Sequence, residues 1–172
     1  KPRSSCRSTT MLRILKMLLI LIVASWGLIA ALQNFADWQG TLGAVGAATS
    51  MATFEGGAES WQATSNSILI WLGALFIVFS KIVSGALCLA GSRQMWRARR
   101  AGTAEFQGSK NLALSGCAIA LIMLFGGFIV IAESWFELWR SDEMRGPVLD
   151  SAFRYGGMIA LIALFVSTPD EV

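Results

Sequence analysis

Lys81 is the side chain in this sequence whose position most requires a chemical explanation. It interrupts the run Leu75–Gly91, LFIVFSKIVSGALCLAG, which is otherwise apolar, small or hydroxylated. If this run crosses a membrane, a cation at its middle costs on the order of 3 kcal/mol or more. We therefore expect Lys81 to contact a partner or to line a polar path, together with Ser84 and Gly85 on the same helical face.

The helical face that carries Lys81 is built from smaller residues than the opposite face. Within about 60° of Lys81 on a helical wheel lie Ser67, Ile70, Ala74, Ile77, Val78, Ser84, Gly85 and Cys88. The opposite face holds Leu72, Leu75, Phe76, Phe79, Val83 and Leu87. In membranes, small faces pack against other helices and bulky faces meet lipid. The pattern predicts that Lys81 points into protein.

The depth of Lys81 limits the ways in which its charge can be accommodated. About nine residues, or about 13 Å, separate it from the end of the apolar run at Ala90. A lysine side chain spans roughly half that distance, so snorkelling to the interface is not sufficient. The sequence offers no acid at matching depth, since Glu133 falls at the opposite end of the next apolar run. The partner is then a group on another subunit, unless the lysine is neutral or hydrated and has no role.

A basic run follows the same segment. Ser92–Arg100, SRQMWRARR, contains Arg93, Arg97, Arg99 and Arg100 around Trp96. A lysine or arginine near an anionic membrane surface contributes about 1 kcal/mol. The run is typical of anchoring on anionic lipid, and docking of an acidic partner loop is the alternative.

Aromatic and acidic residues alternate in Glu133–Arg140, ESWFELWR. Trp135 and Trp139, like Trp96, are expected to act as interfacial anchors, because tryptophan is enriched at membrane–water boundaries. Glu133 and Glu137 lie one helical turn apart, but no further ligands are spaced for a cation. We interpret them as a solvated helix face and expect no metal site.

The inventory of reactive side chains is poor. The chain has no histidine, which excludes histidine-ligated metals, histidine bases and serine–histidine–aspartate triads. Its three cysteines are widely separated, and Cys88 and Cys117 are expected to be small buried residues of packed helices. No phosphate-binding loop or cofactor fingerprint is present. The sequence therefore predicts no catalytic residue and no cofactor.

Composition places these residues in a membrane protein. Of the 172 residues 55% are hydrophobic and 15% are charged, whereas about 25% are charged in soluble domains. Four runs approach the roughly 20 apolar residues that cross a bilayer. They cover about residues 12–32, 68–90, 112–132 and 151–167. We predict an all-α fold, a four-helix transmembrane bundle formed by a single domain over residues 11–172 after a disordered basic lead, residues 1–10.

The ends of the runs differ in charge. Basic residues dominate before the first run and between the second and third, whereas acidic residues dominate the other two connections. By the positive-inside rule both termini are cytoplasmic. The first run is longer than a typical signal-peptide core, so we expect it to be retained as a helix. Within the longest connection, residues 33–67, the small-residue stretch GTLGAVGAATSMATF forms either a surface helix or an irregular cap.

Several motifs make the chain similar to a known family. They are LCLAGSRQMWRARRA (Leu87–Ala101), ESWFELWRS (Glu133–Ser141), AFRY (Ala152–Tyr155) and STPDE (Ser167–Glu171), with SMATF (Ser50–Phe54) a weaker match. From about Met11 to its end the chain resembles the bacterial "predicted small integral membrane protein" family, whose members have four spans and no known function. The resemblance implies a bacterial inner-membrane protein. It also implies an acidic residue where this chain has Lys81.

Two hypotheses of function follow from these features. The first is a non-catalytic accessory subunit that packs against a larger membrane protein complex and contacts membrane lipids, including anionic lipid, but no nucleic acid. The second is a small transporter or channel subunit in which Lys81 lines a polar path. An enzyme acting on a lipid or quinone is disfavoured, because the chain offers so few acid–base groups.

Overall fold

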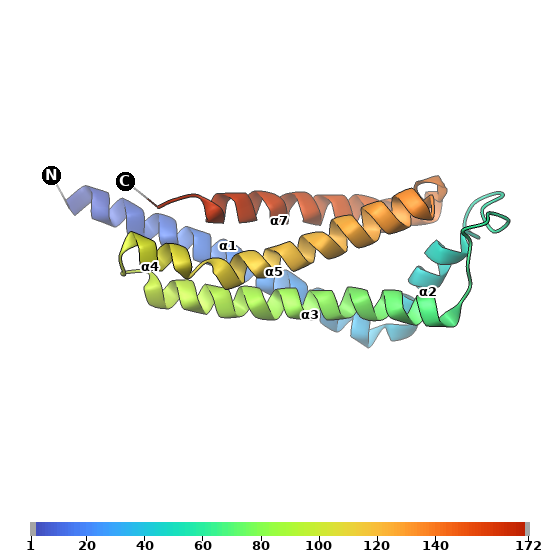
Figure 1. Ribbon diagram of the computed structural model, residues 1–172, viewed down its shortest axis with the longest axis horizontal. Helices are drawn as coiled ribbons and strands as arrows, with labels where there is room; N and C mark the ends of the chain where they lie inside the picture. The colour runs from blue at the N-terminus through green and yellow to red at the C-terminus, as the bar shows by residue number, and fades with distance from the viewer. Residues whose placement is uncertain (1–2, 171–172) are drawn as a thin grey trace.

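The computed structural model describes residues 3–170, with side chains from Thr9 onward. It consists of helices and connecting turns (Figure 1). The long elements are α1 (Arg3–Ala36), α3 (Ser67–Ala98), α5 (Asn111–Leu121) with its continuation η1 (Ile122–Trp135), and α7 (Ser151–Ser167). The short ones are α2 (Trp38–Ser50), α4 (Thr103–Gly108), η2 (Leu138–Arg140), α6 (Asp142–Met144) and η3 (Arg145–Asp150).

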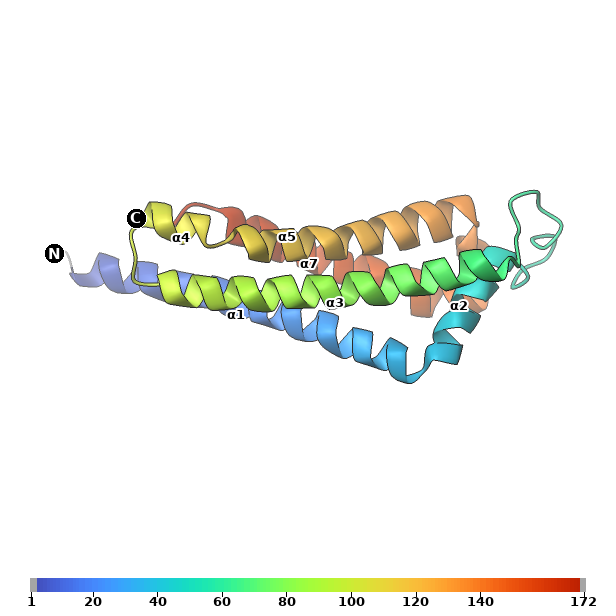
Figure 2. The same cartoon turned by 60° about the horizontal axis from the view of Figure 1, so that its bottom comes forward.

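The long helices lie side by side and form an elongated bundle (Figures 1 and 2). The chain termini and α4 lie at one end, which we call the termini end. Helix α2, the segment 51–66 and the turn from η1 to α7 lie at the other, which we call the cap end. Each end corresponds to one side of the membrane that the bundle crosses.

Four helical segments are long and apolar enough to span a membrane, which confirms the predicted four-helix bundle. They are Thr9–Ala36, Ser67–Ala98, Thr103–Trp135 and Asp142–Ser167. Each is longer than its predicted span, because polar residues that flank the apolar runs continue the same helices. Helix α1 also runs back to Arg3, through residues expected to form a disordered lead; residues 1 and 2 of that lead lie outside the described part of the chain.

We call the half of the bundle nearer the termini end the termini half, and the other the cap half. Glycines allow the helices of the termini half to approach each other closely. A methyl group added to Gly91 of α3 would lie 2.4 Å from the backbone nitrogen of Ala113 in α5. One added to Gly116 would lie 2.6 Å from the sulfur of Cys88. Such contacts let backbones rather than long side chains meet, as is typical of helix packing in membranes.

The largest buried cluster fills this half of the molecule. It includes Ile20 and Val23 of α1, Cys88 of α3, Cys117 of α5 and Val166 of α7. Cys88, Cys117, Ile20 and Val166 are fully buried, so the prediction that the two cysteines are small packing residues is confirmed.

The helices separate toward the cap end. Figure 1 shows η1 diverging from α3 in this direction and Figure 2 shows α1 diverging from α3, while α2 turns back across the opening. The corner between α1 and α2 is set by Asp37, whose carboxylate accepts a hydrogen bond from the backbone N–H of Gly40 at 3.0 Å. This is an N-cap, which satisfies one of the free donors at the start of a helix. Of the two alternatives for the long connection, a helix is formed up to Ser50 and the segment 51–66 is irregular.

Helix η1 is wider than an α-helix. The N–H of Phe136 donates to the carbonyl of Ile131 at 3.0 Å, a spacing of five residues. This π-helical pairing continues over 14 residues, Ile122–Trp135. Such helices are rare and usually one turn long. The apolar pattern of the sequence did not indicate it, because α- and π-helices bury similar residue types.

Candidate functional site

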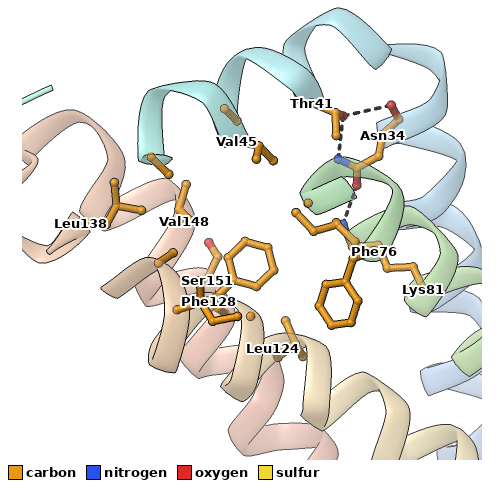
Figure 3. A pocket seen from close by; sticks show the side chains of 18 of the residues that line it. Asn34, Thr41, Val45, Phe76, Lys81, Leu124, Phe128, Leu138, Val148 and Ser151 are labelled. Atoms are coloured by element: carbon orange, nitrogen blue, oxygen red, sulfur yellow. Dashed lines mark hydrogen bonds between the residues drawn. The ribbon is translucent and has the colours of Figure 1, made fainter. Parts of the chain in front are cut away.

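The space between the separating helices is a cavity of about 820 Å³ in the cap half. Its walls come from α1, α2, α3, η1, η3 and the start of α7, and most of the residues that line it are apolar. Figure 3 shows Phe76, Leu124 and Phe128 around its middle, with Val148 and Leu138 on the side away from α1. The cavity has the size and the apolar lining of ordinary ligand sites, which occupy about 300–1,000 Å³.

A chain of three polar side chains lies at one wall of this cavity. The Lys81 ammonium donates a short hydrogen bond to the amide oxygen of Asn34. The amide nitrogen of Asn34 in turn donates to the hydroxyl of Thr41 at 2.9 Å. All three residues line the cavity (Figure 3). Lys81 thus has a partner within its own chain, and that partner is a neutral amide rather than a carboxylate.

The corner between α1 and α2 holds this chain in place. The Thr41 hydroxyl lies 3.0 Å from the backbone carbonyl oxygen of Asn34 and 3.0 Å from that of Asp37. Thr41 therefore ties the start of α2 to the last turn of α1. Both polar ends of the Asn34 side chain are used, so its amide oxygen is fixed toward Lys81.

The helical-wheel prediction for Lys81 is confirmed by burial. Ala74, Val78, Ser84, Gly85 and Cys88 on its face are buried, whereas Leu75 and Phe79 on the opposite face are exposed. Leu72 and Phe76, also predicted for the opposite face, line the cavity. The backbone carbonyl of Lys81 lies against Gly27 of α1, at 3.0 Å from the position of an added methyl group. This face packs against α1, and the lysine side chain emerges beside the packed region into the cavity.

Ser84 and Gly85, predicted to share the role of Lys81, lie elsewhere. Both are buried on the termini side of Lys81, outside the cavity lining. A methyl group added to Gly85 would lie 2.8 Å from the side chain of Leu28. The structure therefore places Gly85 in the packed crossing of α1 and α3. Ser84 lies against α5, where a methyl group added to Gly116 would be 2.8 Å from the Ser84 carbonyl.

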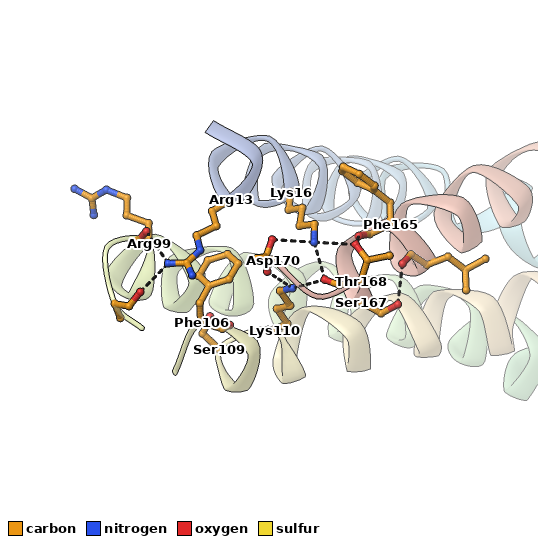
Figure 4. A network of polar contacts seen from close by, with 12 residues as sticks. Arg13, Lys16, Arg99, Phe106, Ser109, Lys110, Phe165, Ser167, Thr168 and Asp170 are labelled. Atoms are coloured by element: carbon orange, nitrogen blue, oxygen red, sulfur yellow. Dashed lines mark hydrogen bonds and ion pairs between the residues drawn. The ribbon is translucent and has the colours of Figure 1, made fainter. Parts of the chain in front are cut away.

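A second polar cluster, which we call the terminal ion cluster, lies at the termini end (Figure 4). It consists of Lys16 of α1, Lys110 before α5, and Thr168 and Asp170 after α7. The carboxylate of Asp170 lies 2.9 Å from the Lys16 nitrogen and 2.5 Å from the Lys110 nitrogen. Both lysines also donate to the carbonyl of Thr168, at 2.7 and 2.9 Å. All three charged side chains are buried.

The terminal ion cluster fixes the chain after α7 across the ends of α1 and α5. Burial disfavours the ionised form of Asp170, but hydrogen bonds from Lys110 and Lys16 outweigh this effect and hold the pKa of the carboxyl below its ordinary value. Asp170 is therefore an anion at neutral pH.

Arg13 extends this network along α1. Its guanidinium donates to the carbonyls of Arg99 and Ala101 at 3.3 and 2.7 Å, and it lies 4.6 Å from the centre of the Phe106 ring. Arg13 thus satisfies carbonyls at the end of α3 and stacks on an aromatic face. The terminal ion cluster and Arg13 are structural in form, since their contacts join α1 and the start of α5 to the segments that follow α3 and α7.

The predicted basic surface lies next to the terminal ion cluster. Arg93, Arg97 and Arg100 are exposed, and in the described part of the chain they make no salt bridge. Arg99 instead stacks on the ring of Trp96, 3.9 Å from its centre. These arginines offer positive charge at the termini end of α3.

The other predicted anchors lie at the two ends of the bundle. Trp96 at the termini end is exposed, as are Trp135 and Trp139 at the cap end. Trp135 packs edge-on against Trp61 of the segment 51–66, with ring centres 5.2 Å apart. The predicted helix face carrying Glu133 and Glu137 is wrong, because the helix ends at Trp135 and Glu137 adopts a left-handed φ of 49°. Glu137 pairs with Arg140 at 2.8 Å.

Two features of these sites were missed from the sequence. Asn34 lies just beyond the predicted span 12–32, so it was assigned to a connecting loop. Asp170 lies beyond the predicted fourth span, although the motif STPDE around it had been noted. Lys16 lies near the start of the first apolar run and Lys110 just before the third, and the group that they share is brought to them by the path of the chain after α7.

The family comparison agrees with a membrane protein of four helices. No curated protein and no solved structure matches the chain. A family model described as "Predicted small integral membrane protein (DUF2165)" matches residues 12–169. This match includes most of α1, the other three long helices, the Lys81–Asn34–Thr41 chain and, apart from Asp170, the terminal ion cluster. The chain therefore belongs to the DUF2165 family of predicted small integral membrane proteins.

Proposed function

We propose that this protein is a non-catalytic accessory subunit that packs against a larger complex in the bacterial inner membrane, with both termini on the cytoplasmic side. The observation that carries the proposal is the outward face of α7. In the most apolar 18-residue stretch of the fourth span, 17% is buried inside the molecule, whereas 39% of the corresponding stretch of the first span is buried. Most of this helix therefore has its contacts outside the chain.

The outward face of α7 combines large side chains with a small residue between them, as a helix-packing surface does. Phe153, Gly157, Leu161 and Leu164 recur at helical spacing, and the three large residues are 73%, 63% and 65% exposed. Gly157 is exposed between Phe153 and Leu161, and a methyl group added there would meet nothing within 4 Å. A notch between large side chains admits a side chain of a neighbouring helix, and small residues are enriched where membrane helices meet.

The basic surface at the termini end supports the same proposal. Arg93, Arg97 and Arg100 are exposed next to Trp96. On the cytoplasmic side they would attract anionic lipid headgroups or an acidic loop of the partner. Association would then combine apolar packing on α7 with charge complementarity at the end of α3.

Transport is the second candidate, and the position of Lys81 in the cavity wall favours it. A path through this chain would have to continue through the termini half. There Gly91 of α3 lies against Ala113 of α5, and Gly116 of α5 lies against Cys88 of α3. Fully buried side chains fill the interior around them. A polar path would therefore run between subunits rather than through one of them.

Purification from its native membrane in a mild detergent tests the accessory role. We expect a stoichiometric partner whose recovery is lost when the notch is filled by Gly157→Leu. Gly126→Leu is the matched control, because Gly126 of η1 also has nothing within 4 Å of an added methyl group. Recovery of the wild-type protein as a lone monomer would contradict the proposal, as would equal effects of the two substitutions.

A further inference from the structure

We infer that the cavity in the cap half is a binding site for a long-chain carboxylate dissolved in the membrane, with Lys81 as the residue that recognises the carboxylate. This inference stands apart from the proposed accessory role, because the site is formed within one chain and does not involve the outward face of α7.

The first argument is the composition of the cavity wall. Of the residues that line its 820 Å³, Lys81 is the charged one, and no aspartate or glutamate of the described chain is among them. The site therefore carries net positive charge in a half-open cavity whose lining is mostly apolar. Electrostatic complementarity favours an anion as its ligand, and the apolar lining favours an anion with a hydrocarbon tail.

The second argument is the set of donors on Lys81. An ammonium group has three N–H donors. In the described residues one of them is used, by the amide oxygen of Asn34. Asn34 supplies no charge, so the cation lacks a counter-ion deep in the bundle. A carboxylate would accept the remaining donors and neutralise the charge, and such charge-assisted hydrogen bonds are about twice as strong as neutral ones.

The third argument is the arrangement of polar and apolar groups. Figure 3 shows Lys81, Asn34 and Thr41 on one side of the cavity, and Val45, Val148 and Leu138 on the other. An amphiphile placed with its head at Lys81 would extend its tail beneath α2 toward these side chains.

Depth decides between kinds of anionic amphiphile. Lys81 lies 14 residues after Ser67, the first residue of α3, which is about 21 Å along the helix. A phospholipid carries its charged headgroup at the membrane interface, so its phosphate would not reach this depth. A long-chain carboxylic acid can enter the hydrocarbon region in neutral form, and its proton is released to water when the carboxylate pairs with the Lys81 ammonium.

Two adjacent glycines of η1 provide a matched pair of variants. Gly127 lines the cavity, and a methyl group added to it would lie 3.2 Å from the ring of Phe76. Gly126 is outside the lining, and a methyl group added there would meet nothing within 4 Å. Gly127→Leu therefore fills the cavity, whereas Gly126→Leu adds the same side chain at the next residue without filling it.

The experiment is equilibrium binding of radiolabelled palmitate to the purified chain in nanodiscs of zwitterionic lipid, with empty nanodiscs subtracted. We expect one palmitate per chain and binding of hexadecanol, which has the same tail and a neutral head, at least about tenfold weaker. Lys81→Met should remove this preference. Gly127→Leu should weaken palmitate binding at least about tenfold relative to Gly126→Leu.

Three results would overturn the inference: no palmitate binding above the empty nanodiscs, equal binding of palmitate and hexadecanol by the wild-type chain, or identical behaviour of the two leucine variants. The comparison of palmitate with hexadecanol needs no substitution, so it remains decisive if Lys81→Met fails to fold. Failure of this experiment leaves the accessory role intact, because that role is measured by recovery of a partner protein.

Discussion

The two halves of this bundle provide different partners for their buried lysines. In the termini half, Lys16 and Lys110 share the carboxylate of Asp170, and the surrounding helices are in close contact. In the cap half, Lys81 has the neutral amide of Asn34 and adjoins a cavity of about 820 Å³. In the first arrangement the helices are closely packed, and a carboxylate of the same chain pairs with both lysines. The second leaves both charge and space for something else, which is the form expected of a binding site rather than of a structural core.

The largest effect that separates the halves should come from Gly91. A side chain at this position would collide with the backbone nitrogen of Ala113, which cannot move without displacing α5. We expect Gly91→Leu to destabilise the protein by more than about 3 kcal/mol, beyond the usual cost of overpacking. Thermal unfolding in detergent measures this. In the cap half, Gly127→Leu should leave the midpoint within a few degrees of the wild type; equal losses would show that the cap half is as tightly packed.

The next largest effect should come from Asp170. Asp170→Asn keeps the shape of the side chain but leaves Lys16 and Lys110 without their carboxylate. Removing one partner of a buried ion pair costs about 3–5 kcal/mol. Asp142→Asn is the control, because Asp142 is exposed and lies 3.8 Å from Arg145, and exposed pairs contribute about 0–1 kcal/mol. Comparable unfolding midpoints for the two variants would contradict a stabilising role for the terminal ion cluster.

A pH dependence accompanies this cluster. The folded protein lowers the pKa of Asp170 from its ordinary value of 3.8, so the carboxylate stabilises the fold above that pH. The contribution is lost as pH falls below this value through the lower folded pKa. Unfolding midpoints measured from pH 6 to pH 2 should therefore fall more steeply for the wild type than for Asp170→Asn. Parallel curves would show that Asp170 is not the group responsible.

A smaller effect of opposite sign is expected at Lys81. Its cation has a neutral partner, so Lys81→Met should leave the unfolding free energy unchanged or raise it by about 1–2 kcal/mol. Asn34→Leu should lower it, because the lysine then loses its hydrogen-bond acceptor. The contrast between these two variants is measured by unfolding in the absence of any added amphiphile. A strong destabilisation by Lys81→Met would mean that the lysine holds the bundle together, as Lys16 and Lys110 do.

The contrast between the halves was only partly visible in the sequence. Apolar runs predicted the four spans, and the helical wheel placed Lys81 on the packed face, because both depend on periodicity within one helix. The partner of Lys81 was not predictable in this way. Asn34 belongs to another helix, and its position depends on how far α1 continues before the corner at Asp37.

The same limitation applies to the termini end and to the cavity. Asp170 meets Lys16 and Lys110 because the chain after α7 crosses two other helices, and no spacing in the sequence encodes that crossing. The cavity lies where η1 and α1 diverge from α3, and this divergence leaves the apolar pattern unchanged. Charge alone suggested a site at Lys81, but its shape required the fold.

The most direct test of the difference between the halves is to locate a bound carboxylate by NMR. Palmitate with natural protons would be added to the methyl-labelled protein in nanodiscs of deuterated lipid. We predict nuclear Overhauser effects between the palmitate chain and the methyl groups of Val45 and Val148 in the cavity, and none to Ile20 and Val23, which are buried in the termini half. Effects confined to outward-facing methyl groups such as that of Leu164, with none in the cavity, would contradict the account.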